Sequence, residues 1–73
     1  MKTYTDGDND SNIMGYDYGE SWIRVYFKDN SEYEYAGGEV GQYVIDQMKY
    51  LADSGEGLNS FIGKNKPKYS SKR

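Results

Sequence analysis

The stretch of sequence that decides the fold is WIRVYFKDNSEYEY, residues 22–35. In its first half, apolar residues alternate with polar or amphipathic ones, which is the period of a half-buried strand. In its second half, glutamates alternate with tyrosines. The Asp-Asn-Ser link between them suits a tight turn, because Asn and Asp tolerate a left-handed backbone. The stretch therefore predicts a β-hairpin with strands over 22–28 and 32–36, and the residues expected on its buried face are Ile23, Val25 and Phe27.

The segments on either side complete a small domain. IMGYDY, residues 13–18, predicts a further strand before a Gly-Glu-Ser turn. After Ala-Gly-Gly the period becomes helical over 39–53. A short helical piece is expected at Leu58–Ile62. The predicted fold class is α+β: a three-stranded antiparallel sheet packed on one amphipathic helix, with a short C-terminal helical piece. The helix residues expected in the core, from a stripe that begins at Val40, are Val44, Met48 and Leu51.

Charge divides the chain of 73 residues into three parts. Residues 1–56 hold all twelve acids and four basic residues, for a net −8, whereas residues 57–73 hold five basic residues and no acid. We expect a flexible acidic arm over 1–12, a single domain over 13–63 and a flexible basic tail over 64–73.

Composition argues against an enzyme. The chain has neither histidine nor cysteine, so the usual general base near neutral pH and the usual soft nucleophile are missing. Asp6, Asp8 and Asp10 have the spacing of a calcium loop, but Ser11 stands in place of its turn glycine and Asp17 in place of its bidentate glutamate. We therefore expect no metal and no cofactor. Since no run of about 20 apolar residues occurs, we expect no membrane span and a cytoplasmic protein.

The ordered set of motifs resembles the KTSC domain family, named for a domain at the C-terminus of some lysyl-tRNA synthetases and also found as short proteins in bacteria and phages. The matching pieces are Gly15-Tyr16-Asp17, Ile23-x-Val25-x-Phe27, Tyr33-Glu34-Tyr35, Tyr43, Ser54-Gly55 and Asn59-x-x-Ile62. The resemblance covers about residues 11–62. It implies no established activity, and RNA binding is the function that it suggests.

Two surfaces are candidates for binding. The hairpin face opposite the core is expected to carry Trp22, Arg24, Tyr26 and Lys28, an aromatic and basic composition that is typical of protein contacts. The alternative for this face is simple cross-strand pairing with Glu32 and Glu34. The basic tail is the segment suited to phosphate, through Lys64, Lys66, Lys68, Tyr69, Lys72 and Arg73. Its alternative is a solvated tail that folds back on the acidic body.

The tyrosines of the second hairpin strand also have two interpretations. Tyr33 and Tyr35 either form the core face of that strand or serve as stacking platforms for bases. The sequence thus predicts a non-enzymatic binding module that engages a protein partner through the exposed sheet face, as a phage or bacterial regulator or inhibitor would. The alternatives are an RNA- or DNA-binding module that uses the basic tail, and a structural accessory domain without its own ligand.

Overall fold

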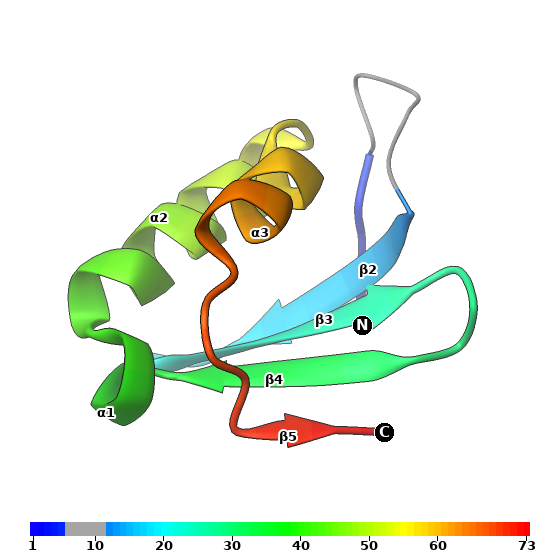
Figure 1. The fold of residues 1–73 in the computed structure, drawn as a ribbon. Helices are drawn as coiled ribbons and strands as arrows, with labels where there is room; N and C mark the ends of the chain where they lie inside the picture. Colours follow the sequence, from blue (N-terminus) through cyan, green and yellow to red (C-terminus); the bar gives the residue numbers. More distant parts are fainter. Residues whose placement is uncertain (6–11) are drawn as a thin grey trace.

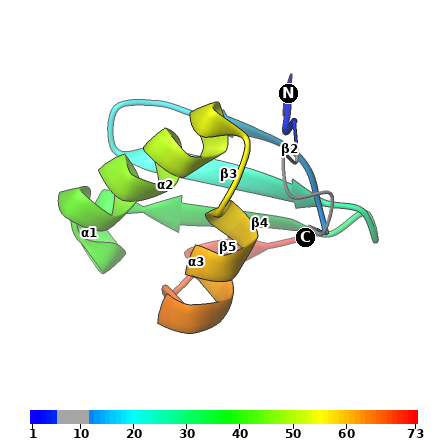
Figure 2. The ribbon, with the colours of Figure 1, turned by 90° about the horizontal axis from the view of Figure 1, so that it is seen from above.

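A single antiparallel sheet forms one layer, and helices cover one of its faces (Figure 1). The computed structural model describes residues 1–5 and 12–73, and all statements below refer to these. In space, as along the chain, the strands follow the order β1-β2-β3-β4-β5. The strands are β1 (Lys2–Thr3), β2 (Ile13–Tyr18), β3 (Trp22–Phe27), β4 (Glu32–Ala36) and β5 (Ser71–Lys72). The helices are α1 (Gly37–Val40), α2 (Gln42–Ser54) and α3 (Leu58–Asn65), and α2 crosses above the sheet with α3 beside it (Figure 2).

The predicted hairpin is confirmed as β3 and β4. Val25 lies opposite Tyr33 and Arg24 opposite Glu34, so successive side chains alternate between the helix-covered face and the open face of the sheet. The turn bends at Asn30, whose φ of 73° is the left-handed conformation that asparagine tolerates. The α+β class and the strand over 13–18 are also confirmed.

The core lies between the sheet and α2. Ile23 and Val25 are fully buried, so these predictions are confirmed, and Tyr35 is 2% exposed, as its core interpretation requires. Phe27 is only half-buried and packs at the margin of the core. The remaining core residues come from β2, the helices and the N-terminal segment; they are Tyr4, Ile13, Tyr16, Ile45, Met48, Ala52 and Leu58.

The predicted helix over 39–53 is two helices with a break at Gly41. Gly41 has a φ of 92°, which an L-residue rarely adopts, so α2 starts in its own phase at Gln42. The apolar stripe counted from Val40 therefore does not follow the buried face of α2. Met48 is buried as predicted, but Val44 and Leu51 are only partly buried, and the residues on the central line of the buried face are Ile45, Met48 and Ala52.

Both chain ends contribute a short strand, so the prediction of a three-stranded sheet is wrong in the number of strands. β1 pairs with β2 and β5 pairs with β4, which makes the sheet five-stranded. Tyr4 is 4% exposed, and its hydroxyl accepts a hydrogen bond from the Leu58 backbone N–H at 3.3 Å. The ends order because each supplies backbone partners to an edge strand that would otherwise lack them. The part of the acidic arm over 6–11, including the aspartates with calcium-loop spacing, lies outside the described residues.

Candidate functional site

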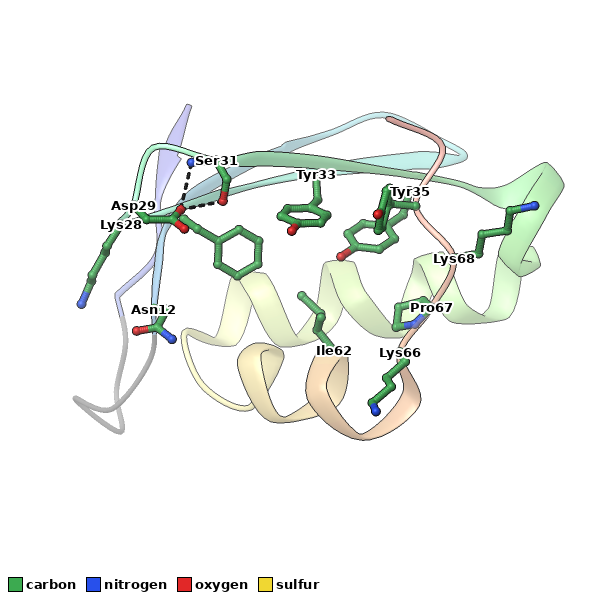
Figure 3. A pocket seen from close by; sticks show the side chains of 12 residues that line it. Asn12, Lys28, Asp29, Ser31, Tyr33, Tyr35, Ile62, Lys66, Pro67 and Lys68 are labelled. Atoms are coloured by element: carbon green, nitrogen blue, oxygen red, sulfur yellow. Dashed lines mark hydrogen bonds between the residues drawn. The ribbon is translucent and has the colours of Figure 1, made fainter. Parts of the chain in front are cut away.

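A groove of about 1000 Å³ lies on the helix side of the molecule, between β4 and the chain that leaves α3. Tyr33 and Tyr35 project into it from the sheet, while Ile62 and Pro67 face them from the other side (Figure 3). Phe27 and Tyr69 complete its apolar lining. Three lysines also line it: Lys28, Lys66 and Lys68.

The end of α3 directs the chain across this groove. The backbone N–H of Lys66 caps α3 by donating to Ile62 O at 2.9 Å, and Lys66 itself is left-handed, with φ of 44°. Pro67 cannot continue a helix, so the chain extends from there toward the sheet. At Ser70 it reaches β4, where the Ser70 N–H and hydroxyl donate to Glu34 O at 2.7 and 3.0 Å. The basic tail is thereby held along the edge of β4.

Aromatic rings meet around Tyr33. Phe27 contacts Tyr33 edge-on with ring centroids 5.3 Å apart, and Tyr69 does so from the tail at 4.9 Å. Lys72, the β5 residue paired with Tyr33, places its Nζ 5.3 Å from the same ring. Tyr69 is 47% exposed, so its ring is accessible. Tyr35 lies deeper, and burial raises the pKa of its phenol to about 12. Tyr35 thus belongs to the core and Tyr33 to its margin, and both line the groove.

Positive charge predominates at the groove. Its lining contains the three lysines and one acid, Asp29. Asp29 Oδ1 accepts hydrogen bonds from the Ser31 N–H at 3.0 Å and the Ser31 hydroxyl at 2.6 Å, which lower the pKa of this carboxyl. Lys68 lies 3.6 Å from a Glu39 oxygen, but its side chain is 81% exposed, so this ion pair is weak and easily exchanged.

The open face of the sheet differs from the prediction in how its polar groups are used. Arg24 donates to Glu34 Oε1 through Nη2 at 2.6 Å and through Nε at 3.1 Å, which raises the pKa of the guanidinium. The Tyr26 hydroxyl donates to Asp17 at 2.8 Å and lowers the pKa of that carboxyl. Cross-strand pairing with Glu34, the alternative for this face, therefore engages Arg24, whereas Tyr26 bonds to Asp17 of β2.

The other two residues predicted for this face, Trp22 and Lys28, differ in where they lie. Trp22 packs so closely over Gly19 that a Cβ there would overlap its indole ring, and the Arg24 guanidinium lies 5.7 Å from the Trp22 ring centroid. Lys28 follows the end of β3 and lines the groove on the helix side. Trp22, Arg24 and Tyr26 therefore stay next to one another on the open face, whereas Lys28 lies apart from them.

The residues predicted for phosphate binding are brought together in part. Lys66, Lys68 and Tyr69 line the groove, and Lys72 lies beside its aromatic ring system. Lys64 is exposed on α3 outside the lining, and the Arg73 backbone exchanges two hydrogen bonds with that of Glu32 at 2.8 and 2.9 Å. Sequence reasoning missed the contributions of Phe27, Ile62 and Pro67. The alternation in 22–28 places Phe27 on the tyrosine side. The charge division allowed a tail that folds back on the acidic body, but it did not indicate a path beside β4.

Neither a metal centre nor a membrane span is found in the described part of the chain. Within residues 1–5 and 12–73, no three potential His, Cys, Asp or Glu ligands cluster closely enough to hold a metal ion. The helices described here are too short and too polar to cross a bilayer. Comparisons with models of known families, with curated proteins and with solved structures find no match to this chain. The resemblance to the KTSC domain family therefore stays a prediction.

Proposed function

We propose that this protein is a non-enzymatic binding module whose ligand-binding site is the groove between β4 and the segment after α3. The observation that carries the proposal is the meeting of an aromatic lining with lysines on one concave surface. Such a surface favours a ligand with a flat apolar part and negative charge. The flat part gains contact with the rings, and the charge is attracted by Lys28, Lys66 and Lys68.

Binding fits the chemistry of the groove better than catalysis does. A general base works best when its pKa is close to the working pH, and the hydrogen bonds from Ser31 lower the pKa of Asp29 instead. The full sequence also supplies no histidine or cysteine to take that role. A ligand would therefore be held and released unchanged.

A protein partner on the open sheet face has weaker support. The polar groups of Arg24, Glu34, Asp17 and Tyr26 already hydrogen-bond to one another. A partner that covered them would remove these pairs from water without offering them new bonds, which costs free energy. Within the part of the chain that the structure describes, the Lys66 side chain forms no ion pair, and the ion pair of Lys68 with Glu39 is largely exposed.

The experiment is a titration with a planar organic anion, anilinonaphthalene sulfonate, followed residue by residue in ¹H–¹⁵N NMR spectra. We expect shifts confined to β4, the end of α3 and residues 66–72. Tyr69→Ser and Lys68→Gln should each weaken binding. Tyr43→Ser and Lys64→Gln are the matched controls, because Tyr43 is 76% exposed on α2 and Lys64 lies outside the groove lining, and they should leave binding unchanged.

The outcome that contradicts the proposal is equally specific. Shifts centred on Trp22 and Tyr26, lost in Trp22→Ala and kept in Tyr69→Ser, would place the binding site on the open sheet face.

A further inference from the structure

We infer that the ligand of the groove is a single-stranded nucleic acid, with its bases against the aromatic lining and its phosphates on the lysines. This inference rests on the proposed function of the groove and adds the chemical class of the ligand. It differs from binding by a free basic tail, because β5 and the Ser70 hydrogen bonds fix the tail beside the sheet tyrosines.

The aromatic lining of the groove is suited to nucleic-acid bases. Every base has two flat faces, so an accessible aromatic side chain can hold a base whatever its sequence. Tyr69 is the accessible end of an aromatic cluster in which Phe27 and Tyr33, both partly buried, pack edge-on with neighbouring centroids 5.3 and 4.9 Å apart. Tyr69 at its outer end is 47% exposed and offers a ring to the solvent. A base within a duplex has both faces covered by its neighbours, so only an unpaired strand fits this lining.

Lysines stand on both sides of the groove. Lys28 comes from the hairpin side of the groove, whereas Lys66 and Lys68 come from the segment that leaves α3, so cations stand on two sides of the rings. Lys72 adds a cation next to Tyr33. A phosphodiester backbone that passes over the rings would meet these lysines in turn. The net charge of the whole chain is −3, so phosphates are favoured at this surface and disfavoured over most of the remainder.

The volume of the groove also favours a chain of several nucleotides. A cavity of about 1000 Å³ is at the upper end of the range for small-molecule sites. A short run of nucleotides fits a cavity of this size better than one isolated planar molecule. An acidic peptide would use the same lysines, but it would leave the exposed ring of Tyr69 without a flat partner.

The test is fluorescence anisotropy with a labelled oligothymidylate of about eight nucleotides, at about 50 and 200 mM salt. The other arms are the oligouridylate of equal length, the matching duplex, and polyglutamate as competitor. We expect single strands to bind at least about tenfold more tightly than the duplex, since stacking on aromatics supplies much of the affinity. Polyglutamate should compete only weakly. Comparison of the two single strands shows whether the site distinguishes DNA from RNA.

Variants separate stacking from charge. Tyr69→Ser should weaken single-strand binding about tenfold at either salt concentration. Lys68→Gln should reduce the slope of log affinity against log salt by about 0.7. The controls Tyr43→Ser and Lys64→Gln should change neither quantity by more than about twofold.

Three results would overturn the inference. They are equal affinity for duplex and single strand, full competition by polyglutamate, and single-strand binding that is unaffected by Tyr69→Ser. If the planar anion still binds at the groove in these cases, the proposed function stands and only the nucleic-acid assignment fails. If neither the anion nor the oligonucleotide shifts groove resonances, both proposals fail.

Discussion

The Tyr16 hydroxyl on β2 donates a 2.7 Å hydrogen bond to Asp53 Oδ1 near the end of α2, across 37 residues of sequence. The Tyr18 hydroxyl donates to the other oxygen of the same carboxylate at 2.6 Å, and Lys2 Nζ from β1 lies 3.2 Å from Oδ1. One carboxylate on α2 thus gathers three donors from two neighbouring strands. These interactions join α2 to the sheet on the β1–β2 side, away from the β4 edge where the groove lies.

Asp53→Asn should destabilise the fold. The substitution keeps the shape of the side chain but removes its charge and replaces one acceptor oxygen by an NH₂ donor. Asparagine therefore cannot accept hydrogen bonds from Tyr16 and Tyr18 at two separate oxygens. Hydrogen bonds to charged groups contribute more than neutral ones, but this carboxylate is 44% exposed, so we expect a loss of about 1–2 kcal/mol. Urea denaturation followed by circular dichroism measures it.

The control for this substitution is Asp46→Asn on the same helix. Asp46 is 60% exposed; it accepts from Gln42 at 2.9 Å and lies 3.9 Å from Lys49. Its replacement should cost no more than about 0.5 kcal/mol. Equal losses in the two variants would show that Asp53 contributes only as a surface charge of α2.

Acid should weaken the protein partly through the same carboxylate. The hydrogen bond from Tyr18, with that from Tyr16, lowers the pKa of Asp53 below its ordinary value of 3.8. The folded state then binds fewer protons than the unfolded chain around that pH, so the stabilisation is complete above pH 3.8 and is lost as the pH falls through the folded-state pKa. Stability measured from pH 6 to about pH 2 should fall more steeply in the wild type than in Asp53→Asn. Parallel curves would contradict this assignment.

The phase of α2 leads to a contrast between adjacent residues. Ile45 is fully buried, so Ile45→Ala leaves a cavity and should cost about 2–5 kcal/mol. Val44 is only partly buried, so Val44→Ala should cost about 1 kcal/mol. Chemical denaturation of the two variants gives both values. The opposite order would mean that the stripe counted from Val40 describes the helix after all.

Much of the fold follows from local patterns in the sequence. Alternation over 22–35 specifies the hairpin and its face, since a slip of one residue would bury Arg24 and Tyr26 in place of Ile23 and Val25. The phase of α2 could not be obtained that way, because one glycine in a left-handed conformation resets it. The strands β1 and β5 could not be predicted from local patterns either. Each is two residues long, and its pairing depends on a distant edge strand rather than on a period of its own.

The candidate site was predictable only in fragments. The tyrosines of β4 and the lysines of the tail were each recognised as suited to bases or phosphates, but as separate features. What joins them is tertiary: α3 ends at Lys66, Pro67 turns the chain back, and Ser70 binds the backbone of Glu34. Polar pairing on the open face, in contrast, follows directly from the strand register that places Arg24 opposite Glu34.

Gly55 should not tolerate a side chain. It caps α2 with φ of 80°, and its N–H donates to Leu51 O at 3.1 Å and Ala52 O at 3.2 Å. A left-handed conformation costs an L-residue about 1–2 kcal/mol, and a Cβ at Gly55 would also overlap the Thr5 hydroxyl, which must then move. We therefore expect Gly55→Ala to lower the free energy of unfolding by about 2–3 kcal/mol, measured by urea denaturation.

Gly38→Ala is the matched control for this position. A Cβ at Gly38 would meet no atom within 4 Å, and its φ lies outside the left-handed range in α1. Alanine loses less backbone entropy than glycine when a helix forms, so this variant should be neutral or more stable by up to about 1 kcal/mol. Thr5→Gly combined with Gly55→Ala separates the two causes at Gly55. If overlap with Thr5 dominates, the double variant recovers most of the loss, whereas backbone strain alone would leave the loss in place.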